Sequence, residues 1–318
     1  MGESVKAIWA ALVVNIIICL VKLAAALITG SSAMLAESFH SLADSGNQLL
    51  LLIGQRLSMR PPDVQHPFGY GKERFFWAFV VAISMFAVGA TFSVYEGVKG
   101  FLQPHRITNP TINYIILGLG IFLESIALRI AYKQFSAMRK FGIWRSLCEA
   151  KDPALLTVIF EDSAAMVGIV LALLGIFLTQ ITGNAFYDSA ASVVIGLMLA
   201  GIAFFLARES KDLLIGESAC EADRSKILTA VHSIPEVSEC MELLTMHISP
   251  EEILVNINVH FVDGLETDQI EQAIDSIERS IKTAVPAVGR IFIEADTVLR
   301  PKRQGGSVGQ PDYAATDS

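Results

Sequence analysis

Six long stretches of mainly apolar residues recur along this 318-residue chain, and they constrain its fold more than any other feature. Each is long enough to cross a bilayer, which takes about 20 apolar residues in a helix. Because lipid offers no hydrogen bonds to an open backbone, such stretches fold as membrane-spanning helices. The predicted spans are 5–28, 33–56, 75–102, 110–134, 153–181 and 186–208.

Composition and charge agree with a membrane protein that has a soluble end. Charged residues make up 18% of the chain, whereas a soluble domain usually carries about 25%. Residues 1–210 hold 15 Lys and Arg against 13 Asp and Glu, but residues 211–318 hold 9 against 19. The acidic second part argues against nucleic acid as a partner.

The residues after 210 have the pattern of a small soluble domain. Helical spacing at 221–234 is followed by alternating stretches at 237–247 and 253–262, then by a helix and a strand at 290–298. We therefore predict an α-helical membrane protein with six transmembrane helices in residues 1–210 and a small α+β domain of αββαβ order in residues 211–299. Residues 300–318 are polar and rich in Gly and Pro, which predicts a disordered tail.

Basic residues predict the orientation of the spans. The joint between the second and third spans carries Arg56, Arg60 and Lys72, and the joint between the fourth and fifth is also basic, whereas the 1–2 and 5–6 joints have no Lys or Arg. The positive-inside rule then places both termini in the cytoplasm of a bacterial-type inner or plasma membrane. The four cysteines are scattered and indicate neither a disulfide framework nor a thiolate zinc site.

Side chains that ligate metals lie inside the second and fifth spans. His40 and Asp44 are about one helical turn apart, and Asn47 continues the same stripe. An ionisable residue at membrane depth costs at least about 2.5 kcal/mol, so it marks an ion or proton path. The fifth span adds the adjacent carboxylates Glu161 and Asp162, which diverge by about 100° on a helix and cannot both point squarely at one ion.

An imidazole and carboxylates from two facing helices suit a divalent cation, with zinc first and manganese, iron and cobalt behind it. The alternative for His40 taken alone is a hydrogen bond across the bundle. His40 and Asp44 together with an acidic pair on another span favour a cation path over packing.

Other charged residues inside the spans are expected to be structural. Lys22 is expected to snorkel toward an interface. Glu124 is expected to pair between helices or to belong to a proton relay. The remaining members of this group are Glu96, Arg129 and Asp188.

Two longer motifs extend the pattern. Residues 36–44 read AESFHSLAD, and residues 66–73, at the joint between the second and third spans, read HPFGYGKE. With six spans and an acidic αββαβ tail, the chain resembles the cation diffusion facilitator family from about residue 5 to residue 298. The run EDSAA at 161–165 is similar to a divergent branch that includes the mitochondrial and nuclear-associated zinc transporter relatives.

The resemblance implies a homodimeric metal/proton antiporter that exports divalent cations from the cytoplasm by alternating access. It also implies two ligands from each of the second and fifth spans in a tetrahedral site, and a cytoplasmic tail that dimerises and often binds regulatory metal. By position, His40 and Asp44 fill the second-span pair and Asp162 fills one place of the fifth-span pair.

The chain departs from the zinc-transporting pattern at Val158, where that pattern has a histidine. Valine cannot ligate, so the fourth place falls to water, to Glu161 after a local helix distortion, or to Asn47. Replacing an imidazole by oxygen hardens the site, which weakens the case for zinc and raises that for manganese or iron.

The resemblance implies two further sites. The family's loop site uses an Asp and two His, which correspond to Asp63, His66 and Tyr70, so that site is expected to be weak or absent.

In the tail, the matching positions are His260, Glu294 and Asp296, with Met241 where a further His would be. They form either a site for one regulatory ion or an acidic surface near a dimer interface.

Ligand protonation supplies the expected mechanism. Metal binding needs neutral His40 and ionised Asp44 and Asp162, so loading an ion expels protons and protonation releases it. We expect zinc efflux by proton antiport and no enzyme, since there is no nucleophile, phosphate loop or H-E-x-x-H motif. A proton-coupled carrier of an organic solute, which should show broken spans in paired halves, and a non-transporting metal-binding scaffold or regulator are the alternatives.

Overall fold

The computed structural model describes residues 2–103, 110–138 and 152–296. Its contacts divide the chain into two compact units. The first contains residues 1–218 together with Met246–Glu252, and the second contains Ala219–Thr245 and the residues from Ile253 onward. The predicted tail at 300–318 lies outside the described residues.

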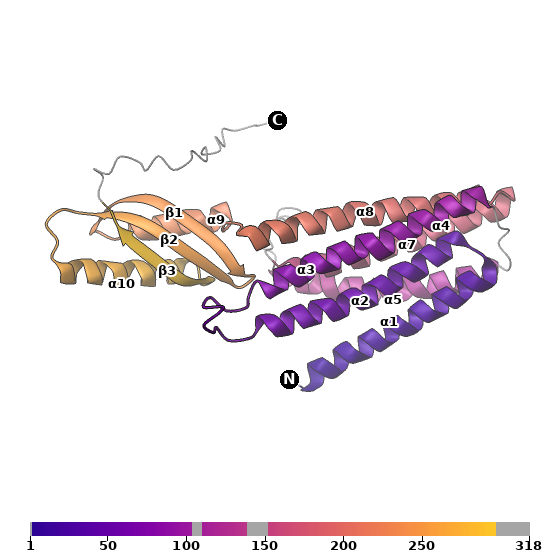
Figure 1. Ribbon diagram of the computed structural model, residues 1–318, viewed down its shortest axis with the longest axis horizontal. Helices are drawn as coiled ribbons and strands as arrows, with labels where there is room; N and C mark the ends of the chain where they lie inside the picture. Colours follow the sequence, from indigo (N-terminus) through magenta and orange to yellow (C-terminus); the bar gives the residue numbers. More distant parts are fainter. Residues whose placement is uncertain (1, 104–109, 139–151, 297–318) are drawn as a thin grey trace, which may run out of the picture. The chain divides into compact units, whose positions relative to one another are not determined.

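Helices occupy all six predicted spans of the first unit (Figure 1), which confirms the predicted fold class. The third span is made of α3 and α4, which are joined by a π-helical segment. The elements are α1 (Gly2–Thr29), α2 (Ser32–Ser58), α3 (Glu73–Ser84), the π-helical segment Met85–Ala90, α4 (Thr91–Leu102), α5 (Pro110–Met138), α7 (Pro153–Thr182) and α8 (Phe186–Ile215).

Three stretches are long and apolar enough to cross a membrane by length and composition: Glu73–Leu102, Pro153–Thr182 and Phe186–Ile215. Shorter apolar stretches, Ile16–Thr29 and Thr111–Ile126, lie in α1 and α5. Within the described residues α2 is the exception among the six spans, because its buried face is largely polar.

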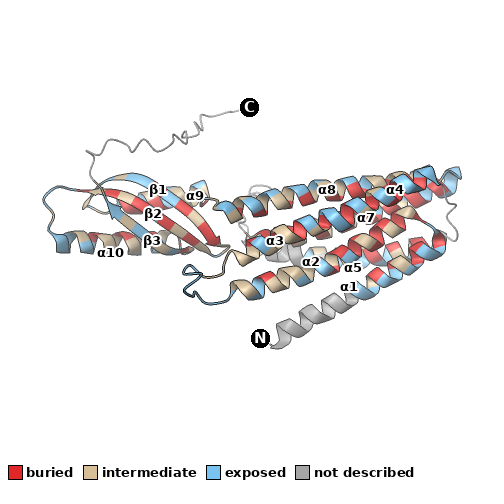
Figure 2. Cartoon of the chain, in the orientation of Figure 1, coloured by how far each residue is buried: buried red, intermediate tan, exposed pale blue. Residues whose placement is uncertain are grey.

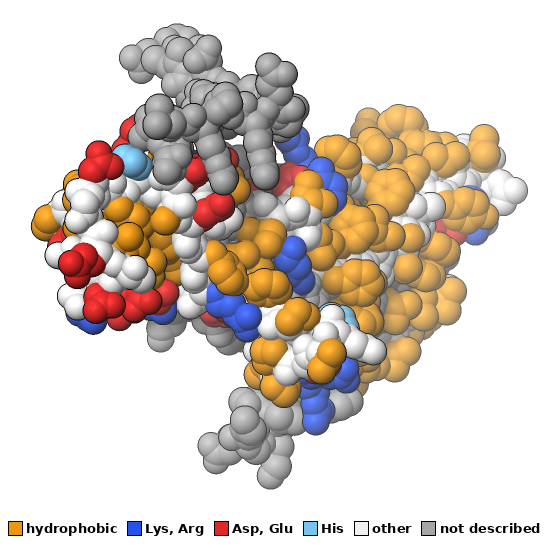
Figure 3. All heavy atoms as spheres, turned by 60° about the vertical axis from the view of Figure 1, so that its left-hand side comes forward, with side chains coloured by type: hydrophobic (Ala, Val, Ile, Leu, Met, Phe, Trp, Pro, Cys, Tyr) orange, Lys and Arg blue, Asp and Glu red, His pale blue; other side chains and the backbone are white. Residues whose placement is uncertain are grey.

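Apolar side chains lie both inside and outside the bundle. Ile169, Ile195 and Leu199 are fully buried, whereas Leu27 and Phe204 are more than 70% exposed. Figure 2 shows buried and exposed residues alternating along the helices of this unit. Figure 3 shows hydrophobic side chains over most of the helical part that it displays. An apolar exterior of this extent suits lipid rather than water as the surrounding solvent.

Ser31 and Asp188 fix the start of α2, the helix whose buried face is largely polar. Ser31 caps α2 through a hydrogen bond from the Met34 amide, and Asp188 of α8 accepts hydrogen bonds from the Ser31 hydroxyl (2.7 Å) and the Ser32 amide (2.6 Å). Asp188 is therefore structural, as expected. α2 lies inside the bundle and contacts α1, α3, α4, α7 and α8.

The second unit has the predicted αββαβ order. Its three-stranded sheet has the order β1-β2-β3, and β2 pairs with β3 in parallel, with Val255 opposite Ile291. The elements are α9 (Glu221–His232), β1 (Val237–Ser249), β2 (Glu252–Phe261), α10 (Thr267–Ala284) and β3 (Val288–Ala295).

Alternation along β2 builds the core of this unit. Val255, Ile257 and Val259 are buried at every second position and belong to the same apolar cluster as Ile277 and Ile281 of α10. The opposite face of the sheet is more exposed and includes Asn256, Asn258 and His260.

Candidate functional site

The buried face of α2 carries a stripe of polar side chains, which we call the α2 stripe: Glu37, His40, Asp44 and Asn47. The spacings of three and four residues keep them on one face of the helix. The side chains of Glu37 and Asn47 are 0% exposed and that of His40 is 1% exposed, and Asp44 is 17% exposed. The stripe therefore faces the interior of the bundle.

His40 and Asp44 lie close together but leave their polar atoms without hydrogen bonds. The distance from Nδ1 of His40 to Oδ1 of Asp44 is 3.4 Å. Neither of these atoms, nor Nε2 of His40, has a hydrogen-bond partner in the part of the chain that the structure describes. Buried polar atoms are normally paired, so these atoms are candidate ligands for a cation.

Glu161 of α7 meets the same stripe from the opposite helix. Nδ2 of Asn47 donates a hydrogen bond of 2.6 Å to Oε1 of Glu161, and both side chains are buried. Oδ1 of Asn47 has no partner among the described residues. α7 is helical without a break from Pro153 to Thr182, so Glu161 reaches Asn47 without the local helix distortion that one of the three alternatives for the fourth ligand required.

The buried positions of α7 are shifted by one residue from the positions that the resemblance implies for ligands. Thr157, Glu161 and Ala164 are buried, whereas Val158 and Asp162 are partly exposed. Asp162 is still near enough for its charge to act on Asp44. The structure thus brings Glu161 into direct contact with the α2 stripe and places Asp162 beside it.

The donor atoms are not yet gathered around one point. Among the described residues no group of three or more His, Cys, Asp or Glu side chains is arranged to hold a metal ion. The contacts instead form two pairs, His40 with Asp44 and Asn47 with Glu161. One imidazole and several oxygen donors would suit a borderline or hard divalent cation once they close on it.

Lys22 of α1 is a residue whose role the sequence did not reveal. It is 0% exposed, so the expectation that it snorkels to an interface is wrong. Its Nζ lies 3.3 Å from Oε2 of Glu37 and donates a hydrogen bond of 2.8 Å to Oγ of Ser41. The available signal was Glu37 itself, a carboxylate at the helical spacing of the α2 stripe.

The loop residues Asp63, His66 and Tyr70 form a hydrogen-bonded turn. The Tyr70 hydroxyl donates a hydrogen bond of 2.6 Å to Asp63, whose other oxygen accepts bonds from the amides of Gln65 and His66. The Tyr70 hydrogen bond is the largest cause that lowers the pKa of Asp63, and the same bond raises the pKa of Tyr70. The Tyr70 hydroxyl thus forms a hydrogen bond with the Asp63 carboxylate, which a metal ion at this site would need as a ligand.

The three tail residues share the outer face of the sheet. Glu294 pairs with Asn258 in the β2–β3 register, and Nδ1 of His260 lies 3.0 Å from the backbone oxygen of Asp296. His260 therefore contacts the backbone of Asp296, and Glu294 is exposed. His260 and Glu294 lie on the paired parallel strands β2 and β3, and Asp296 follows directly after β3.

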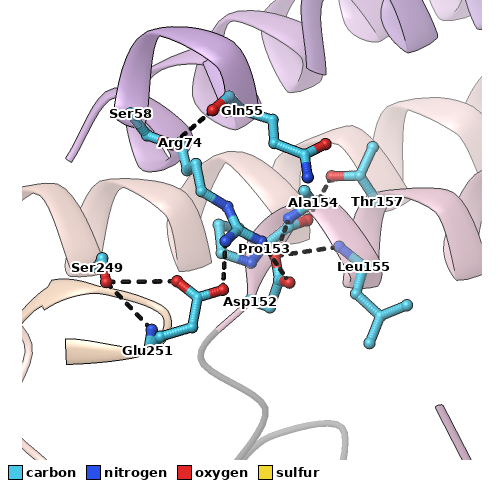
Figure 4. Close-up of polar contacts among 10 residues, drawn as sticks. All are labelled: Gln55, Ser58, Arg74, Asp152, Pro153, Ala154, Leu155, Thr157, Ser249 and Glu251. Carbon is cyan, nitrogen blue, oxygen red and sulfur yellow. Dashed lines mark hydrogen bonds and ion pairs between the residues drawn. The ribbon is translucent and has the colours of Figure 1, made fainter. Parts of the chain in front are cut away.

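Arg74 of α3 holds the start of α7 through an ion pair with Asp152 (Figure 4). Its Nη2 lies 2.7 Å from Oδ2 of Asp152, and its Nη1 pairs with Glu251. Asp152 also caps α7 by accepting hydrogen bonds from the amides of Ala154 and Leu155. All these residues belong to the first unit, and they fix the beginning of the helix that carries Glu161.

Comparison with known proteins identifies the family. A model of the cation efflux transmembrane domain matches residues 8–215. The chain belongs to the cation efflux family. The resemblance to the cation diffusion facilitators is thereby confirmed, and the family consists of transporters and not of enzymes. Together with the apolar helices, it makes this an integral membrane protein of the cation efflux family.

Curated relatives cover much of the chain. It is 30% identical over 289 residues to "Proton-coupled zinc antiporter SLC30A9, mitochondrial" of Xenopus laevis, over 88% of this chain and 51% of that protein. It is 26% identical to the magnetosome protein MamM of Paramagnetospirillum magneticum, over 96% and 91% of the two chains, and 27% identical to the cation-efflux pump FieF of Escherichia coli O139:H28, over 91% of each. The chain spans about half the length of the SLC30A9 relatives.

Solved structures of the MamM C-terminal domain also match. One in a nickel form is 13% identical over 24% of this chain and 96% of that chain, with a TM-score of 0.23. We draw no conclusion from a likeness of that size.

Proposed function

We propose that this family member exports zinc in exchange for protons, and that the ion binds between the α2 stripe and α7. The observation that supports this most is the set of buried ligand atoms that have no hydrogen-bond partner among the described residues. They are both ring nitrogens of His40, Oδ1 of Asp44 and Oδ1 of Asn47, with the carboxylate of Glu161 opposite. Leaving buried polar atoms unpaired costs about 1–3 kcal/mol each, which a bound cation would offset.

The ligands we propose are His40, Asp44 and Glu161, with Asn47 as the fourth donor. Asp162 is the alternative to Glu161, because a small rotation of α7 would exchange the two carboxylates. An imidazole with two carboxylates is a ligand set that zinc accepts. The relative SLC30A9 is named a zinc antiporter, which favours zinc over manganese, iron and cobalt as cargo.

Proton coupling follows from the chemistry of these donors. A metal ion binds the neutral imidazole and the ionised carboxylates, so protons and metal compete for the same atoms. Opening the site to a more acidic compartment protonates the ligands and releases the ion. The returning protons then reset the empty transporter, which couples proton entry to metal exit.

We also propose that the chain works as a homodimer through the unit built on the β1-β2-β3 sheet, with both termini in the cytoplasm of a bacterial-type inner or plasma membrane. The exposed apolar side chain of Leu244 on strand β1 suits contact with a second copy of this sheet. His260, Glu294 and Asp296 would supply a regulatory cation site near that interface, and we expect the loop at Asp63 and His66 to bind no metal.

Transport by the reconstituted protein tests this function. Proteoliposomes with an imposed pH gradient should take up zinc, and His40→Ala and Glu161→Gln should each abolish uptake. Glu96→Gln serves as the matched control, because Glu96 is also buried in a span but pairs with Lys99 (3.2 Å). If His40→Ala retained uptake, the site assignment would be wrong, and zinc binding without any uptake would favour the scaffold alternative.

Parallel assays decide the cargo and the carboxylate. Zinc, manganese, iron and cobalt uptake should be compared in the wild type, Glu161→Gln and Asp162→Asn. We expect zinc to be preferred and Glu161→Gln to have the larger effect. A larger effect of Asp162→Asn would make Asp162 the ligand, and faster manganese uptake than zinc uptake would change the cargo.

A further inference from the structure

A complete ion pair is buried in the first unit next to the α2 stripe. Nζ of Lys22 lies 3.3 Å from Oε2 of Glu37, and the two side chains are both 0% exposed. The ammonium group also donates a hydrogen bond of 2.8 Å to Ser41. Removing two charges from water is expensive, and a buried pair is often no more stable than apolar residues of the same size. Stability alone therefore gives a weak reason for its presence.

Glu37 is positioned like a further ligand of the proposed transport site. It precedes His40 by three residues and Asp44 by seven, so it projects from the same helical face. Its second oxygen, Oε1, is buried and has no hydrogen-bond partner among the described residues. Gly168 of α7 provides the space for it, because a Cβ atom at that position would collide with Oε1 of Glu37.

The charge of Lys22 also reaches the proposed ligands. His40 and Asp44 both lie close enough for the ammonium to act on them electrostatically, and so does Glu124 of α5. In an environment of low dielectric constant, such interactions are far stronger than in water. The ammonium therefore repels any cation that approaches the His40–Asp44 pair, while it neutralises the carboxylate nearest to that pair on α2.

We propose that Lys22 is a tethered cation that competes with the transported ion for the carboxylates of the α2 stripe. It holds Glu37 away from the metal and weakens binding at His40 and Asp44, so that the ion can leave. Lys22 is a positioning residue in this role and touches no metal itself. The role rests on the proposed function, because it requires that His40 and Asp44 bind the cargo.

A double-mutant cycle on the full chain gives this role a distinctive signature. Removing the positive charge alone, in Lys22→Met, should tighten zinc binding and slow turnover, because Glu37 is released as an additional ligand. Removing the negative charge alone, in Glu37→Gln, should weaken binding, because an unpaired ammonium remains. At an effective dielectric constant of about 20, each change in the dissociation constant should be about ten- to a hundredfold.

The double variant Lys22→Met/Glu37→Gln supplies the rescue. It removes both charges together, so its dissociation constant for zinc should return to within about threefold of the wild-type value. Replacing both partners also avoids leaving one buried charge unpaired, so this variant should fold even if a single variant does not. A merely structural ion pair would instead weaken binding in both single variants.

The measurements are zinc titration calorimetry on the purified chain in lipid nanodiscs, and KM and kcat for zinc uptake in proteoliposomes. In Lys22→Met we expect both KM and kcat to fall. If Lys22→Met binds zinc no more tightly than the wild type, or if it does not fold and the double variant departs from wild-type affinity by more than about tenfold, the tethered cation is refuted.

His40→Ala separates this result from a failure of the proposed function. If His40→Ala leaves zinc binding unchanged, the transport site itself is misplaced, and the role of Lys22 falls with it. If zinc binding depends on His40 but Lys22→Met and Glu37→Gln do not change the dissociation constant in opposite directions, only the tethered cation is overturned.

Discussion

The α2 stripe of the first unit and the outer face of the sheet in the second unit each place a histidine near a carboxylate residue. On α2, His40 is buried and its nitrogens have no hydrogen-bond partner within the described residues. On the sheet, His260 is partly exposed, and its Nδ1 is 3.0 Å from the backbone oxygen of Asp296. The same residue types therefore indicate different roles. Burying polar atoms without hydrogen-bond partners costs free energy, whereas a hydrogen-bonded histidine near the surface does not.

The largest expected effect is a pair of matched histidine substitutions. His40→Ala should lower zinc uptake by at least about 100-fold, because it removes a proposed ligand, whereas His260→Ala should change it by no more than about threefold. Zinc uptake by proteoliposomes measures both. Equal losses in the two variants would abolish the distinction between the units and make the sheet face part of the transport path.

The next largest effect is expected from a substitution in the apolar core of the second unit. Ile277 of α10 is 0% exposed and belongs to the apolar cluster with Val255 and Ile257. Ile277→Ala should lower the free energy of unfolding of this unit by about 2–5 kcal/mol through the cavity it leaves. Denaturant unfolding followed by circular dichroism measures it, and a change below about 1 kcal/mol would mean that the helix does not pack as described.

A smaller effect should follow from the amide that meets Glu161. Asn47→Ala removes the hydrogen bond of 2.6 Å to that carboxylate and should destabilise the helical unit by about 1.5–3 kcal/mol. Asn256→Ala, at an exposed position on the sheet, should cost no more than about 0.5 kcal/mol. Thermal unfolding in detergent compares them. A stability change in Asn256→Ala as large as that in Asn47→Ala would count against the buried contact.

The smallest effect concerns the exposed loop and its pH dependence. Because the pKa of Asp63 is lowered, its contribution to loop order is present above the ordinary Asp pKa and is lost as pH falls through the lowered value. Because the pKa of Tyr70 is raised, its contribution is present below the ordinary Tyr pKa and is lost as pH rises through the raised value. The loop should therefore stay closed throughout the neutral range.

Absorbance titration of the phenol, taken as the difference between the wild type and Tyr70→Phe, measures the raised pKa. An ordinary tyrosine pKa would show that the hydrogen bond to Asp63 does not form in solution. Tyr70→His adds the missing imidazole and should create zinc binding at Asp63 and His66, which the wild type and Tyr70→Phe should lack.

Periodicity and composition were enough to predict the six helices and the αββαβ order, because each depends on local pattern and burial. They were also enough to predict that His40 and Asp44 lie on the same face of one helix, because the two residues are about one helical turn apart. α2 differs from the other spans because its buried face is polar, and the cost of that polarity is the reason we propose the site there.

Contacts between helices could not be predicted in the same way. Glu161 and Asp162 differ by one residue, and only the rotation of α7 within the bundle decides which carboxylate meets Asn47. Lys22 and Glu37 pair across two helices, and no spacing within either helix reports that contact. The resemblance carried over Asp162 by position, but it does not include the neighbours that the rotation brings into contact.

The π-helical segment Met85–Ala90 has a consequence for how the third span can change during evolution. A π-helical turn contains more residues than an α-helical turn, so α4 faces a different direction from the one it would have in an uninterrupted helix. α3 contacts α2, α7 and α8, while the small residues of α4, including Gly97 and Gly100, lie against α8. The segment therefore sets which face of α4 lies against α8, and an insertion or deletion of one residue in it would turn that face by about 100°.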